Sequence, residues 1–150
     1  KLGYGQKSYD EPGLDDRDEW LVEGQFDYFF TPKTSMYLRG LRRIHETDSL
    51  GSTDILTHRI LLGYRQRFTA KIRGEAAVSF RNDEYDGEVT IDGTTASRDD
   101  DYLGFTVAIG FSPRSWLNLS LGYEYRDRDS NFDSEDYTSN TMFLRATAAL

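Results

Sequence analysis

Long segments of this 150-residue chain alternate apolar and polar residues with a period of two. That period is the pattern of β-strands with one apolar face and one polar face. The segments are rich in Tyr, Phe, Val, Ile, Leu and Thr, which favour strands. We place eight strands at residues 1–9, 19–31, 35–46, 54–67, 71–82, 100–112, 116–127 and 138–150. The chain is therefore predicted to be all-β.

The connections between these strands alternate between long and short. The short ones are 32–34, 68–70 and 113–115, and the long ones are 10–18, 47–53, 83–99 and 128–137. The short connections contain no acidic residue, whereas the long ones and the adjoining strand ends hold nearly all of the 26 Asp and Glu residues. Alternating tight turns and long loops are typical of an up-and-down β-barrel. The two ends of the molecule are expected to differ in charge.

The two faces of the predicted strands differ even more sharply. One face is apolar and has Arg42 as its only fixed charge. The other face of strands two to eight combines Arg and acidic residues with small residues such as Gly104 and Thr106. Small residues beside Arg fit a crowded polar interior, because the guanidinium group satisfies several buried acceptors at once. A soluble ligand-binding β-barrel, with its apolar face inward, is the alternative.

Composition limits the remaining fold and function classes. No stretch approaches the roughly 20 apolar residues of a membrane-spanning helix. The net charge of −8 argues against nucleic acid, and the absence of Cys excludes disulfides and thiolate metal sites. In hydrocarbon, a closed sheet pairs every backbone donor. We therefore predict a single domain over 1–150, a transmembrane antiparallel up-and-down β-barrel of eight strands with periplasmic short turns and long acidic extracellular loops.

Aromatic residues collect near the ends of the predicted strands. Such clustering predicts two girdles at the membrane–water interfaces. The predicted girdle residues are Trp20, Tyr28, Phe30, Tyr64, Phe111, Trp116, Tyr123 and Tyr125.

The C-terminal stretch GYEYRDRDSNFDSEDYTSNTMFLRATAAL, residues 122–150, resembles the last hairpin of the second putative beta-barrel porin family of Gram-negative outer membranes. The stretches FFTPKTSMYLRG (29–40) and GYRQRFTAKIRGEAAVSF (63–80) resemble the tight-turn hairpins of the same family. The family's members are larger barrels. The resemblance thus implies an integral outer-membrane protein, either the C-terminal portion of a larger barrel or a shortened or engineered version. It also implies a passive porin or export-associated role without catalytic residues.

Charged residues of the polar face are the candidate functional set. This lumen charge network is Glu23, Asp27, Arg39, Arg59, Arg73, Glu75, Glu124 and Arg145. We expect its four Arg residues to pair with its four acids, because an uncompensated buried charge is costly. In a closed eight-stranded barrel these side chains would fill the lumen and give a structural role. In a larger barrel they would line a conducting pore with a weak preference for anions.

Metal binding and catalysis have little support in the sequence. Asp127, Asp129, Asn131 and Asp133 imitate the start of a calcium loop but lack its Gly and its final Glu, so they are only a weak calcium candidate. The only histidines, His45 and His58, lie near the loop end, and nothing marks a nucleophile beside them. We predict no cofactor and no enzymatic activity.

The expected partners follow from the predicted location. They are outer-membrane lipid and lipopolysaccharide, the barrel assembly machinery during insertion, and a polysaccharide or small-solute cargo, without nucleic acid.

Overall fold

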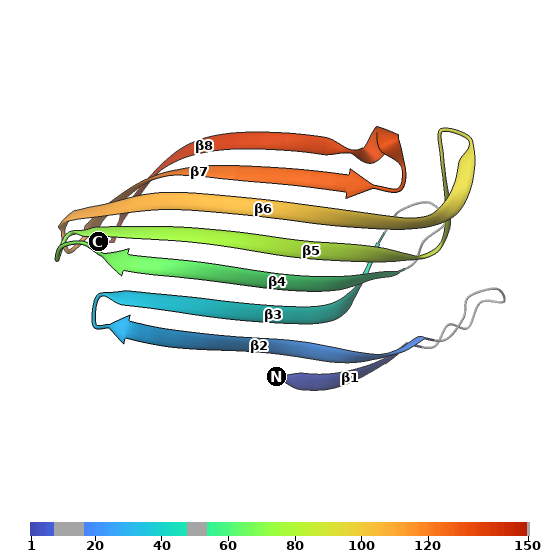
Figure 1. Cartoon of the computed structure of the whole chain (residues 1–150), viewed down its shortest axis with the longest axis horizontal. Helices are drawn as coiled ribbons and strands as arrows, with labels where there is room; N and C mark the ends of the chain where they lie inside the picture. Colours follow the sequence, from blue (N-terminus) through green and yellow to red (C-terminus); the bar gives the residue numbers. More distant parts are fainter. Residues whose placement is uncertain (8–16, 48–53, 150) are drawn as a thin grey trace.

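The computed structural model describes residues 1–7, 17–47 and 54–149, which form one curved sheet of eight antiparallel strands in chain order (Figure 1). The strands are β1 (Leu2–Lys7), β2 (Arg17–Thr31), β3 (Thr34–Glu46), β4 (Asp54–Arg67), β5 (Ile72–Ile91), β6 (Thr94–Arg114), β7 (Leu117–Ser130) and β8 (Tyr137–Ala148). A short 3₁₀ turn, η1 (Asp133–Glu135), lies between β7 and β8. The predicted all-β, up-and-down order of eight strands is confirmed.

Within the described ranges, no helix has the length and apolar character needed to cross a membrane.

Three tight turns join β2 to β3, β4 to β5 and β6 to β7, as predicted, and all lie at one end of the sheet (Figure 1). Threonine hydroxyl groups stabilise two of them. Thr31 Oγ1 accepts a hydrogen bond from the Lys33 amide at 3.1 Å, and Thr69 Oγ1 accepts one from the Ile72 amide at 3.0 Å. Such side-chain acceptors replace backbone partners in a turn. These turns fix the register of each hairpin.

The prediction of a long loop at 83–99 is wrong. β5 and β6 continue past the rest of the sheet and meet at a two-residue turn, Asp92-Gly93, with a register shift between Glu84 and Glu88. Both turn residues have positive φ, 51° for Asp92 and 80° for Gly93, which a tight hairpin turn of the primed type requires. An Asp-Gly pair between alternating β-branched residues is a strong hairpin signal that the sequence interpretation missed.

The other long connections are described only in part. The predicted loop at 10–18 falls mostly outside the described residues, and so does that at 47–53. In the last one, predicted at 128–137, β7 continues to Ser130 before η1 begins.

Apolar side chains cover the convex face of the sheet. Its large hydrophobic residues are exposed, from Phe26 at 64% to Val107 at 42% and Met142 at 77%. The opposite face is concave, because residues from seven strands, β2 to β8, line one hollow on it. Among the described residues, the buried hydrophobic side chains are few: Tyr37, Ile55, Leu56, Val89 and Phe132. The predicted apolar outside and polar inside are present, which is the reverse of a soluble barrel.

The predicted closure between the first and last strands is not present. β1 and β8 are the two edges of the sheet and do not pair. β1 covers β2 only from Arg17 to Val22, and Lys1 adds backbone contacts with Glu23. The rest of the β2 edge therefore has no strand partner among the described residues. β1 has 6 residues and β8 has 12, so β1 is too short to pair with β8 along its whole length.

Charge placed on the convex face tests which side meets lipid. We expect Val107→Arg to lower the free energy of unfolding in lipid bilayers by about 2–4 kcal/mol. The adjacent Thr106→Arg puts the same side chain on the concave face, opposite Glu124, and should cost much less. Urea titration of the folded protein in vesicles measures both. A larger loss for Thr106→Arg would reverse the assignment of the faces.

Candidate functional site: the groove of the concave face

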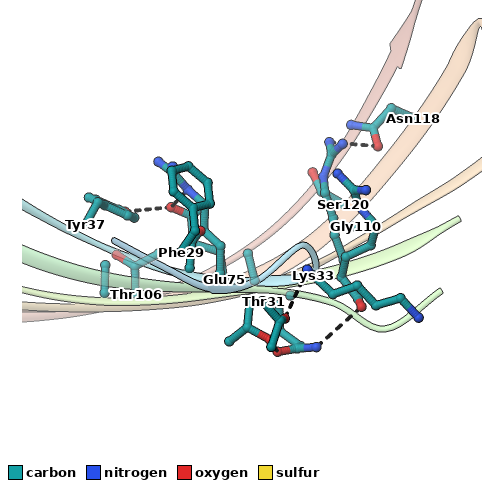
Figure 2. Close-up of a pocket in the computed structure, with 18 of the residues that line it drawn as sticks. Phe29, Thr31, Lys33, Tyr37, Glu75, Thr106, Gly110, Asn118 and Ser120 are labelled. Carbon is teal, nitrogen blue, oxygen red and sulfur yellow. Dashed lines mark hydrogen bonds and ion pairs between the residues drawn. The ribbon is translucent and has the colours of Figure 1, made fainter. Parts of the chain in front are cut away.

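A hollow of about 660 Å³ lies on the concave face at the short-turn end, and we call it the groove (Figure 2). Its lining combines apolar residues, among them Phe29, Leu61 and Phe143, with polar side chains whose charges are mostly basic. The side chains used below are Lys33, Tyr37, Arg65, Arg67, Arg73, Glu75, Asn118, Ser120 and Arg145. Small residues, among them Ala77, Thr106 and Ala108, form its floor. Small floor residues between long cationic ones leave room for water or a solute.

Tyr37 crosses the groove and is its most buried side chain, with 6% exposed. Its hydroxyl group donates a 2.6 Å hydrogen bond to Glu75 Oε1 on β5, two strands away (Figure 2). The ring passes over Gly63 on the intervening β4, where a Cβ atom would lie 2.1 Å from the Tyr37 ring. Only Gly at position 63 leaves space for this ring. The bridge therefore ties β3, β4 and β5 together on the polar side.

Arg65 stands between two acids. Its guanidinium group lies 3.6 Å from Asp27 Oδ1 and 3.6 Å from Glu75 Oε1, and it stacks 4.0 Å from the centre of the Tyr37 ring. Asp27 also accepts a 2.6 Å hydrogen bond from Gln25. Cation–π contact adds to the ion pairs. These two acids are thus satisfied by one arginine and two neutral side chains.

All eight residues of the predicted lumen charge network lie on the polar face, but they do not pair with one another as expected. Among the described ion pairs, Glu23 meets Lys1 at 3.0 Å and Glu124 meets Arg126 at 2.5 Å. Arg39 donates to Gln25 at 2.9 Å. For these three residues the partner lies on the same strand or directly opposite on the next strand, where the strand register fixes the geometry.

Of the three remaining predicted cations, Arg59 lies opposite Arg81 on β5, and the other two contact neutral groups. Arg73 donates to Asn118 Oδ1 at 3.1 Å, and Arg145 lies 5.7 Å from the Phe143 ring centre. Sequence reasoning missed Arg65, Tyr37 and Asn118. The tight turn at 68–71 places Arg65 directly opposite Glu75, so the first of these was accessible from the hairpin register.

A second polar cluster lies at the far end of the concave face, and we call it the outer cluster: Arg98, Asp100, Arg128, Ser130 and Glu135. Arg98 Nη2 lies 2.8 Å from Asp100 Oδ2 and 2.8 Å from Glu135 Oε2. Ser130 donates to Asp100 at 2.5 Å, and Arg128 also binds Glu135. The cluster fastens η1 and the end of β7 to the β5–β6 hairpin.

Burial shapes the ionisation of this cluster. The Asp100 side chain is fully buried, and burial alone would raise its pKa. Hydrogen bonds from Arg98 and Ser130, with the Arg98 and Arg128 charges, outweigh that effect and lower the pKa below its usual value. Nearby, burial raises the pKa of Tyr85 to about 12, so this phenol stays neutral over Arg98. The outer cluster is a structural network with its charges compensated.

Comparison with known proteins identifies the family of this chain. The family described as Putative beta-barrel porin 2 matches residues 1–150. The chain belongs to this family. The crystal structure of Ail, the attachment invasion locus protein of Yersinia pestis, is similar at 18% sequence identity, with 98% of this chain and 93% of Ail covered and a TM-score of 0.37. At that distance nothing is transferred from Ail. No curated protein matches the chain.

The weak calcium candidate of this porin does not form a metal loop. Asp127 and Asp129 lie on β7, because that strand continues further than predicted. Asn131 binds backbone of the neighbouring β6, accepting from the Asp99 amide at 3.0 Å and donating to the Ser97 carbonyl at 2.7 Å. In the described part of the chain, no three His, Asp or Glu residues are grouped to hold a metal ion.

The two histidines of the porin face opposite sides of the sheet. His45 is on the concave side opposite Ile55, and His58 is on the convex side opposite Asn82. They therefore cannot share one site.

The predicted girdle residues lie on or beside the convex face. Trp20, Tyr28, Phe30, Tyr64, Phe111 and Trp116 are exposed. Ring pairs occur between Tyr4 and Trp20 at 5.3 Å and between Tyr28 and Phe30 at 4.9 Å. Tyr123 and Tyr125 lie on the same face of β7 as Leu121, and both are half-buried.

Low pH is expected to destabilise the outer cluster of this protein. Because the pKa of Asp100 is lowered by folding, its contribution to stability is present above its unfolded pKa of about 3.9 and is lost as pH falls through the lower folded value. At pH 7, Asp100→Asn should weaken hydrogen-exchange protection at residues 94–100 by about 3 kcal/mol.

The variant should also lack the wild-type loss of protection below about pH 4. Asp99, whose pKa is raised mainly by burial, contributes in the opposite sense, so its titration does not produce the loss of protection expected from Asp100. An identical acid response in the variant would contradict this role.

Proposed function

We propose that this protein is a passive pore, integral to the outer membrane, whose lumen is lined by the concave face and favours anions. The observation that carries the proposal is the pairing of an exposed apolar convex face with a hollow polar concave face. Membership of a β-barrel porin family supports it. The role requires no chemistry on the solute and no cofactor.

Lipid is the proposed neighbour of the convex face. Exposed large hydrophobic residues continue across all strands from Val22 on β2 to Leu144 on β8. In water such a surface would drive association, whereas in a bilayer it meets acyl chains. Lipopolysaccharide and the assembly machinery are proposed as partners on the same grounds, with the acidic outer end at the lipopolysaccharide surface and no role for nucleic acid.

Anion preference follows from the charges along the concave face. The arginines there outnumber the acids within the strands. Short of the outer cluster they are Arg39, Arg43, Arg59, Arg65, Arg73, Arg81, Arg126 and Arg145, against Glu23, Asp27, Glu75, Asp83 and Glu124, and Arg81 is paired with Asp83. A ring of fixed positive charge in a pore raises the local concentration of anions and excludes cations. The open sheet and small floor residues favour a conducting lumen over one filled by side chains.

Planar-bilayer recording tests the pore. The refolded protein should give steady ohmic current steps, and a KCl gradient should give a reversal potential of the sign expected when chloride is more permeant than potassium. Replacing Arg39 and Arg59 together by Gln should move that potential toward zero. Folded protein that inserts and gives no current steps would contradict the pore and leave a structural barrel as the function.

A further inference from the structure

We propose that the short-turn end of the groove binds a small solute carrying two or more carboxylate or phosphate groups. This site rests on the proposed pore, because it would be the point where such a solute is held on its way through. It is tested separately from conduction.

Cations at this end of the groove outnumber the acids that could neutralise them. Glu75 is the acid that lines the groove, and Arg65 with Tyr37 already satisfies it. Lys33, Arg67, Arg73 and Arg145 also line the groove, and none has a carboxylate within 4 Å among the described residues. A cavity with this excess is a favourable place for an anion.

The strand register concentrates these charges. Arg67 on β4 lies directly opposite Arg73 on β5, and like charges in that position destabilise a sheet. An anion between the two guanidinium groups would remove the repulsion and accept hydrogen bonds from both. The other opposed pair on these strands, Arg59 and Arg81, differs because Arg81 is paired with Asp83, so Arg67 and Arg73 are the pair left for an anion.

Small residues extend the site across the next two strands. In register, Arg73 is followed by Gly110 on β6, Ser120 on β7 and Arg145 on β8. The Arg73 side chain lies over Gly110, where a Cβ atom would be 3.0 Å from its Nε, and it donates a hydrogen bond to Asn118. This neutral partner leaves the Arg73 charge uncompensated. Cations on β4, β5 and β8 around one cavity suit a solute with several anionic groups.

Calorimetric titration of the full chain, folded in a zwitterionic detergent at an ionic strength on the order of 0.01 M, measures binding without conduction. Citrate and inorganic pyrophosphate are the probes, with acetate as the monovalent comparison. We expect citrate or pyrophosphate to bind more tightly than acetate. The double variant Arg67→Gln/Arg73→Gln should weaken that binding about tenfold or more.

The matched control is Arg39→Gln/Arg59→Gln, which removes the same charge from the concave face outside the groove. It should change the affinity by no more than about threefold, as expected for longer-range electrostatics. If the groove variant fails to fold, Arg145→Gln is used, with an expected loss of about threefold or more relative to wild type.

The results distinguish which anionic groups the site recognises and whether the site and the pore exist independently. Binding of citrate alone would assign carboxylates, binding of pyrophosphate alone would assign phosphates, and binding of both would assign charge multiplicity as the recognised feature. No binding of either probe, or equal losses in the two double variants, would overturn the site. Current steps without binding would overturn the site and leave the pore, whereas binding without current steps would overturn the pore and leave the site.

Discussion

Backbone hydrogen bonding is the constraint on which the rest of this structure depends. Except at the two edges of the sheet, which include the part of β2 beyond Glu23, the strands satisfy their amide and carbonyl groups on neighbouring strands, so regular pairing needs no apolar core. Side chains then alternate between the two faces, except at the register shifts near the strand ends. The curvature of the sheet turns one set outward and gathers the other around the groove. The same alternation that gives a soluble sandwich its core here gives an apolar exterior and a polar interior.

Charge divides the concave face into two ends with different physical character. At the outer end, Arg98 and Asp100 belong to a compact network in which each buried charge has an opposite partner. At the short-turn end, Arg67 and Arg73 face one another without a carboxylate between them. Compensated charge stabilises a fold, whereas uncompensated charge is available to a solute. The position of the acids, rather than the number of arginines, distinguishes the structural end from the candidate binding end.

Much of the fold could be predicted from the sequence because two-residue periodicity and tight turns are local signals. Strand order, the short turns and the chemistry of both faces followed from them. The β5–β6 extension was missed because its acidic residues suggested a loop, although the Asp92-Gly93 turn signal was present. The open edges could not be predicted, since closure depends on long-range pairing of β1 and β8. The predicted ion pairs were wrong, because assigning residues to a face does not say which of them lie opposite one another. Arg65 meets Glu75 through the strand register.

The assignment of the two faces is the central claim, and cysteine accessibility tests it most directly. The chain has no native Cys, so Thr106→Cys on the concave face and Val107→Cys on the convex face each introduce a single thiol. In lipid vesicles, a charged, membrane-impermeant thiol reagent should label Thr106→Cys rapidly and Val107→Cys hardly at all. Rapid labelling of Val107→Cys with protection of Thr106→Cys would contradict a lipid-facing apolar surface around a polar pore.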